Sequence, residues 1–238
     1  MTGAPGHGID TARFMQAAGV AGLALGLLLV SLPRLKAAAA YLPVDTALAH
    51  HWRGETPPPE QLSALSARAQ AAMLEHPHHR YFEGQSLLAY LQAMDPALTP
   101  QQRDRLLTIA AETALETVSR APMNPAAWLR VATVRQSLGQ TPEAILPMLM
   151  MSVYSGRVEP TLLMLRLRML HEMQNDMDPD QRRVVVDQTL LAWRLAPTEL
   201  LGEIRSGAIA YDRIAGLLVP AHASIMDEID EAIRASVR

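Results

Sequence analysis

The chain has 238 residues, a formal net charge of −3 and no cysteine; 49% of its residues are hydrophobic and only 4% are aromatic. The lack of cysteine excludes disulfides and thiolate metal sites. The mildly acidic balance argues against nucleic acid as a partner. Many alanines and leucines with few aromatic residues favour helices, and the presence of a single lysine, Lys36, is typical of a GC-rich bacterial genome.

The segment from Phe14 to Leu32 is almost entirely apolar and leads directly into Pro33-Arg34-Leu35-Lys36. A helix of this length spans about 28 Å, close to the thickness of a bilayer's hydrocarbon core. We therefore predict a short tail over residues 1–13 and a transmembrane anchor over 14–36. A cleaved signal peptide is one alternative, but charges just before Ala37–Ala40 suit a lipid interface better than a cleavage site. A buried core helix is the other alternative.

The predicted topology is a single pass through the bacterial inner membrane with the soluble part in the periplasm. Arg13 and the N-terminal amine on one side nearly balance Arg34 and Lys36 on the other. The predicted orientation therefore rests on the commonest arrangement, in which one early anchor is followed by a translocated domain. Within the anchor, Ala18, Gly22 and Gly26 recur every four residues, and such small residues let two helices approach closely. They are candidates for pairing two anchors in a homo-oligomer.

Residues 37–59 are predicted to form a membrane-proximal helix, about Val44 to Trp52, and a linker ending in the Pro-rich stretch Gly54–Pro59. Residues 60–238 then form a helical, repeat-like domain, because their apolar residues recur at spacings of three and four. Val184–Val186 belongs to a helix. Prolines mostly mark helix starts, where the missing N–H costs nothing; they are Pro77, Pro96, Pro100, Pro125, Pro142, Pro160, Pro179, Pro197 and Pro220. The chain is thus predicted to be all-α.

Three similar helix starts, at Pro125, Pro160 and Pro197, lie 35 and 37 residues apart. With Trp128 at the early aromatic position and Ala144 at the small position of the second helix, the first unit resembles a tetratricopeptide (TPR) repeat, whose period is near 34 residues. Met148 and Met151 depart from the family pattern, and the following units match in spacing only. The resemblance implies helical hairpins with Trp128 and Ala144 packed inside.

The overall layout has a second resemblance. It is carried by one anchor, a Pro-rich break and short phrases at Trp128–Ala132, Met151–Tyr154, Glu159–Arg166 and Gln188–Arg194. Together they resemble the small TPR-like accessory proteins encoded in bacterial exopolysaccharide loci. That resemblance implies a structural part in polymer biosynthesis or export.

Histidines give the main alternative to a non-enzymatic role. The two groups, His50-His51 and His76-Pro-His78-His79, contain imidazoles that suit Zn²⁺ or Cu²⁺. However, neighbouring helical residues point about 100° apart, and the sequence contains no HExxH, GxSxG, P-loop or GxGxxG motif. We therefore predict no catalytic, cofactor-binding or metal-binding residue, and no cofactor.

The surface of the repeat-like domain is the candidate for partner binding. Arginines near the starts of its helices can form a basic strip on the concave side; they are Arg130, Arg135, Arg166, Arg168 and Arg194. Seven methionines between Met148 and Met177 are interpreted mainly as core filling. In a last helix over Ala221–Val237, Ile225, Ile229 and Ile233 form an apolar stripe opposite a solvated acidic face.

Two functions follow from these features. The first is a non-enzymatic, membrane-tethered scaffold that holds other envelope proteins, in polysaccharide biosynthesis or export. The alternative is a membrane-anchored periplasmic enzyme acting on glycans, with histidines and carboxylates gathered in one cleft.

Overall fold

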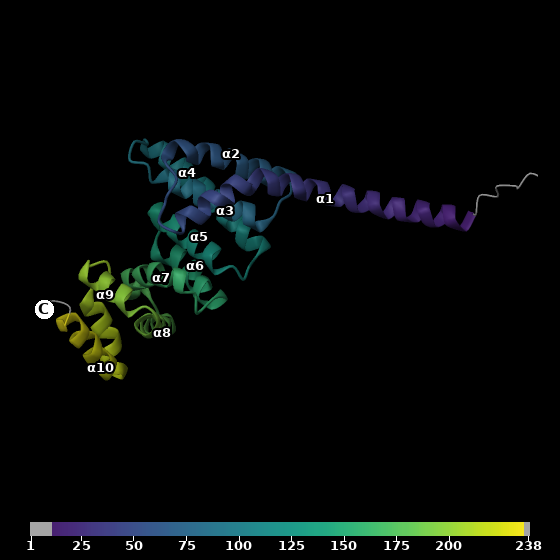
Figure 1. Ribbon diagram of the computed structural model, residues 1–238. Coiled ribbons are helices and arrows are strands. Elements are labelled where there is room, and N and C mark those ends of the chain that lie inside the picture. The colour runs from purple at the N-terminus through teal and green to yellow at the C-terminus, as the bar shows by residue number, and fades with distance from the viewer. Residues whose placement is uncertain (1–10, 236–238) are drawn as a thin grey trace, which may run out of the picture. The chain divides into compact units, whose positions relative to one another are not determined.

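The computed structural model describes residues 11–235, and these residues are helical nearly throughout, without a β-strand (Figure 1). The all-α prediction is confirmed. Residues 1–10 of the predicted tail and Val237 at the end of the last predicted helix lie outside the described residues. The elements are α1 (Thr11–His51), α2 (Pro59–Glu75), α3 (His79–Ala93), α4 (Pro100–Arg120), α5 (Pro125–Ser137), α6 (Pro142–Ser155), α7 (Pro160–Glu172), the 3-10 helix η1 (Gln174–Asp176), α8 (Pro179–Leu195), α9 (Pro197–Arg205) and α10 (Tyr211–Ala235).

The chain divides into two compact units, one ending at Tyr81 and the other beginning at Phe82. The first unit is built on α1, a single helix of 41 residues that continues through Pro33 and Pro43. The separate helix predicted at about Val44–Trp52 is therefore wrong. Each internal proline removes one helical hydrogen bond, and packing of the second half of α1 offsets that loss.

That packing is between α1 and α2, which lie side by side (Figure 1). Ala37, Tyr41 and Val44 of α1 are buried, as are the apolar residues of one face of α2. Tyr41 also donates its hydroxyl to the carbonyl oxygen of Arg80 at 3.0 Å, and Arg80 forms a 2.8 Å ion pair with Asp45. The second half of α1 is thus an integral part of a folded unit.

Proline is the first residue of seven of these helices, α2, α4, α5, α6, α7, α8 and α9. Six of these starts were predicted from the sequence, whereas Pro59, which begins α2, was assigned to the linker. Two N-caps form capping boxes, Thr99 with Gln102 and Asp178 with Gln181, and Asn124 accepts from Ala127 N at the start of α5. Three of the prolines named in the sequence analysis do not begin a helix: Pro77 and Pro96 lie between helices, and Pro220 lies inside α10. The helix kinks nearby, where His222 has non-helical dihedral angles.

Three successive apolar clusters can be followed through the described part of the second unit. The first joins α3, α4 and α5 around Leu107 and Val134; the second joins α5 to α8 around Leu149 and Leu170. The third joins α7 to α10 and includes Ile229. Because neighbouring clusters share helices, the core extends along the sequence from one helix pair to the next.

The predicted burial of Trp128 and Ala144 is wrong in degree, since both residues are only half-buried. The indole of Trp128 lies at the surface of α5 and donates its Nε1–H to the carbonyl oxygen of Pro122 at 2.8 Å. Leu129, Val131 and Ala132 fill the interior side of α5 in its place. In the last helix the predicted stripe is confirmed: Ile229 is buried, and Ile225 and Ile233 pack against the third cluster.

Candidate functional site

The first half of α1 is one candidate site. Of the described helices, α1 is the one long enough and apolar enough to cross a membrane, and none of its most apolar stretch is buried in protein. Leu23, Leu28 and Leu29 are each at least 60% exposed. In water such an apolar surface would be costly, at about 25 cal/mol per Å². The geometry therefore fits a helix that is covered by lipid.

One face of α1 is open in the first half of the helix and covered by α2 in the second half. Positions 18 residues apart, or about five turns, share a face. Gly22 and Gly26 therefore point the same way as half-buried Ala40 and buried Val44, where α2 packs. Ala18 lies at the edge of that face. A Cβ at Gly22 or Gly26 would meet no atom within 4 Å, so both remain open within the predicted anchor.

A second candidate site is the corner formed by the start of α5, the end of α6 and the middle of α7. The side chain of Arg166, on α7, is fully buried there. Its Nε donates to Ser152 Oγ at 3.0 Å, its Nη2 to Ser152 O at 2.7 Å and its Nη1 to Gly156 O at 2.8 Å. Ser152 Oγ in turn donates to Pro125 O at 2.7 Å. One guanidinium thus links three helices.

Electrostatics explains how this arginine is tolerated without a carboxylate in contact. The last carbonyls of a helix carry partial negative charge, and Arg166 binds them where α6 ends. Burial lowers the pKa of Arg166 to about 10, and the nearby carboxylate of Glu159 opposes that shift. The guanidinium still carries its charge at neutral pH.

The predicted arginine strip does not form as a set. Arg166 is wrong as a partner-binding residue because it is buried. Arg130 lies over the Tyr90 ring at 5.0 Å, and burial lowers its pKa. Arg135 donates to Ala144 O at 2.7 Å, and Arg168 pairs with Glu203 on α9. Arg194 is exposed. Most of this basic charge therefore stabilises contacts within the fold.

Three exposed apolar side chains lie within two residues of Gly156 or Pro125 in the sequence, at this corner. Tyr154 and Val158 flank Gly156 in sequence and are 63% and 57% exposed; Met123, two residues before Pro125, is 69% exposed. Gly156 and Pro125 are in contact, since a Cβ on Gly156 would lie 2.8 Å from Pro125 Cγ. We call Met123, Tyr154 and Val158 the corner patch. Exposed apolar patches of this kind are typical of protein-binding surfaces.

The histidines form local clusters. The His78 ring lies 4.3 Å from that of His79 and 6.1 Å from that of His76. Burial, and then the neighbouring His79, lowers the pKa of His78. Across the described residues, no group of three His, Asp or Glu side chains has the geometry to hold a metal ion. His50 instead contacts Glu55 at 2.7 Å, and His51 contacts Thr56 at 3.0 Å.

His171 behaves differently because it is inside the second unit. It is 1% exposed and its Nε2 lies 3.1 Å from Thr189 Oγ1. Burial, chiefly, lowers its pKa to about 4. The ring is therefore neutral at physiological pH.

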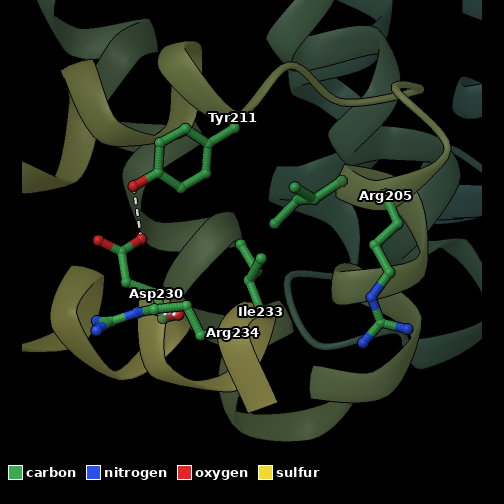
Figure 2. Close-up of a pocket in the computed structure, with 6 residues that line it drawn as sticks. Arg205, Tyr211, Asp230, Ile233 and Arg234 are labelled. Carbon is green, nitrogen blue, oxygen red and sulfur yellow. Dashed lines mark hydrogen bonds between the residues drawn. The ribbon is translucent and has the colours of Figure 1, made fainter. Parts of the chain in front are cut away.

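A shallow pocket of about 380 Å³ lies between α9 and α10 (Figure 2). The side chains of Ile204 and Ile233 line its interior, and Arg205 and Arg234 stand at its edges. Among the residues that line the pocket, Tyr211 donates its hydroxyl to Asp230 Oδ1 at 2.5 Å. This hydrogen bond raises the pKa of Tyr211. The exposed lining surface is mainly apolar, and no histidine lines the pocket.

Comparisons with protein-family models, with curated proteins and with solved structures found no match. Function is therefore inferred from the geometry.

Sequence reasoning missed two features, the buried role of Arg166 and the corner patch. A signal for the first was present: Arg166 shares an apolar helical face with Leu163, Leu167 and Leu170, a position where a solvated arginine would not be expected.

Proposed function

We propose that the protein is a non-enzymatic, single-pass scaffold of a bacterial envelope complex, in polysaccharide biosynthesis or export. In this proposal the first half of α1 spans the inner membrane. The remaining helices form a TPR-like array in the periplasm and hold other envelope proteins. The resemblances in the sequence supply the biological setting, and the geometry of α1 supplies the tether.

The observation that carries the proposal is the continuity of α1. One helix passes from fully exposed apolar turns to turns that pack on α2, without an intervening loop. An anchor on a flexible linker would leave the attached unit free to rotate. Here the membrane segment and the first folded unit share one helix, so the tether also orients that unit. Orienting partners at a membrane is a scaffold's task.

The second unit supports the same role. Its helices pack as successive neighbours, α5 on α6, α7 on α8 and α9 on α10, and stacked helix pairs of this kind present extended binding surfaces. The corner patch offers an exposed tyrosine, and tyrosine is among the residues enriched where binding energy concentrates. The partner in this proposal is the periplasmic part of another envelope protein.

The ionisable residues also favour scaffolding. Burial inside the helix packing lowers the pKa values of Arg130, Arg166 and His171. None of these residues lines the pocket between α9 and α10. An enzyme would be expected to gather perturbed groups in one cleft.

The test is complementation in cells that show a phenotype without the protein. We expect Tyr154→Asp to impair function and to weaken co-purification of membrane partners. Leu74→Asp, which also places a charge on an exposed apolar residue (87% exposed), should leave both unchanged. Equal effects of the two substitutions would contradict the corner patch as the binding surface.

A second arm separates scaffold from enzyme. Alanine is placed singly at His50, His51, His76, His78 and His79, and each variant is expected to retain function. If one of these substitutions abolished function in a folded, membrane-bound protein, the enzymatic alternative would replace the scaffold.

A further inference from the structure

Beyond the apolar segment from Phe14 to Leu32, α1 still exposes large apolar side chains. Leu35 is 67% exposed and Leu42 is 63% exposed. Ala38 and Ala39, on the same side of the helix, are exposed as well. Lipid can cover apolar residues only within the bilayer. The part of this face that lies outside the bilayer, around Leu42, therefore needs a cover other than lipid.

The spacing of this face indicates what covers it. Leu28, Leu35 and Leu42 recur every seven residues, and Ala24, Ser31 and Ala38 fall between them at alternating steps of three and four. A repeat of seven with apolar residues at these two positions is the pattern of helices that pack in a left-handed coiled coil. Left-handed pairs with small residues at the interface are also common inside membranes.

The same face is accessible over its whole length. Leu28, Leu35 and Leu42 lie on the side of α1 roughly opposite Ala37 and Val44, the residues buried by α2. The glycine face is different, because a helix paired along Gly22 and Gly26 would run into α2 farther along. The heptad face, in contrast, allows a second helix to follow α1 from the membrane into the soluble unit.

We propose that α1 forms a parallel homodimer with a second copy of this chain through the face formed by Ala24, Leu28, Ser31, Leu35, Ala38 and Leu42. The membrane carries the argument for a second copy, because it holds all copies in one orientation and at one depth. Each leucine then meets its own counterpart, and each small residue meets a small residue. None of the six is charged, so the face carries no like-charge repulsion against itself. Arg34 and Lys36 lie outside this set.

This inference rests on the proposed membrane anchoring and replaces the pairing face predicted from Ala18, Gly22 and Gly26. Ser31 adds a testable detail. Two Ser31 hydroxyls facing each other near the end of the apolar segment can hydrogen-bond across the pair, as polar side chains do between membrane helices.

The natural chain contains no cysteine, so single cysteines give disulfide crosslinking without background. In membranes, under mild oxidation, we expect Leu35→Cys and Ala38→Cys to yield a covalent dimer of twice the monomer mass. Lys36→Cys is the matched control, since it lies at the same depth but on a different face. It should crosslink several-fold less, as should Gly22→Cys in the anchor.

Adding Leu42→Asp to Leu35→Cys sharpens the test. Leu42 is exposed, so the folded unit should persist, while two aspartates would face each other across the dimer. We expect the crosslinked fraction to fall several-fold with no change in membrane attachment. Crosslinking of Lys36→Cys or Gly22→Cys at the level of Leu35→Cys would overturn the proposed face. Crosslinking of Leu35→Cys only to a different protein would overturn the homodimer.

The two levels of the proposal fail separately. A chain that is absent from membranes would contradict the anchoring, and with it the proposed function. A chain that is present in membranes but lacks face-specific crosslinking would contradict the homodimer alone.

Discussion

The first half of α1 and the corner between α5, α6 and α7 solve opposite problems. The α1 segment is apolar on every side and has no packed protein neighbour among the described residues, which fits a segment that a membrane would cover. The corner buries a charged guanidinium and satisfies it with carbonyl and hydroxyl oxygens. The comparison teaches that folding of the second unit is most vulnerable at a polar contact, whereas the anchor is insensitive to single polar bonds.

The largest effect is expected at Arg166. Replacing it with methionine keeps similar bulk but leaves Ser152 and Gly156 carbonyls buried without their donor. Each such group costs about 1–3 kcal/mol, so we expect a loss of about 3–5 kcal/mol in the free energy of unfolding. Urea unfolding of the detergent-solubilised chain measures it. The matched control is Arg194→Met, at an exposed arginine, and equal losses for the two variants would contradict the corner's role.

His171 should make the same unit sensitive to acid. Its folded pKa of about 4 lies below the ordinary value of about 6.5 for an unfolded histidine. Between these values the unfolded chain binds a proton that the folded chain does not bind. Stability is therefore fully present above about pH 6.5 and falls as the pH drops toward 4, by about 3 kcal/mol in total.

The check compares unfolding free energies of the natural chain and His171→Gln across that pH range. The difference between them should shrink on acidification, because only the natural chain loses the contribution of a neutral, buried imidazole. Two curves that stay parallel between pH 7 and pH 4.5 would contradict the assigned burial of His171.

Replacing two glycines with alanine is expected to change the stability of the second unit in opposite directions. At Gly156 a new Cβ would lie 2.8 Å from Pro125 Cγ, whereas at Gly202, inside α9, it would meet nothing within 4 Å. We expect Gly156→Ala to destabilise by about 1–3 kcal/mol through overpacking. Gly202→Ala should stabilise by up to about 1 kcal/mol through helix propensity. Thermal unfolding of both variants tests this, and matching signs would mean that the corner is less tightly packed than described.

The smallest loss of stability is expected at Trp128. Because the indole is half-buried and makes one hydrogen bond to Pro122, Trp128→Ala should cost about 1–2 kcal/mol, less than a core tryptophan would. Trp52, which is 61% exposed, is the control, and its replacement by alanine should have a smaller effect. A loss above about 3 kcal/mol at Trp128 would indicate the deep burial predicted from the repeat pattern.

Local features of this fold were predictable from the sequence, and long-range contacts were not. Proline marks helix starts through its own fixed φ, so the beginnings of α5, α7 and α9 followed from single residues. The separate helix predicted from about Val44 was wrong, because α1 continues through Pro43, where packing on α2 outweighs the lost hydrogen bond. No local pattern shows that the carbonyls of Ser152 and Gly156 face Arg166, ten or more residues later in the chain.

The candidate sites divide in the same way. The apolar anchor segment is a property of composition and was evident from Phe14 to Leu32. The corner patch depends on which apolar residues remain exposed after packing. The sequence alone does not distinguish the exposed Tyr154 from its buried neighbour Val153. Likewise, the arginine strip failed because Arg166 turns inward on a helix whose periodicity already placed it among leucines.

The central claim is that this chain is held in a membrane by an uncleaved α1. The direct measurement is fractionation of cells that produce the full chain, followed by an alkaline wash of the membranes and N-terminal sequencing of the product. The account predicts that the protein stays in the washed membranes with its N-terminus intact, and that deletion of residues 1–36 releases it. A soluble product that begins near Ala39 or Tyr41 would contradict the account.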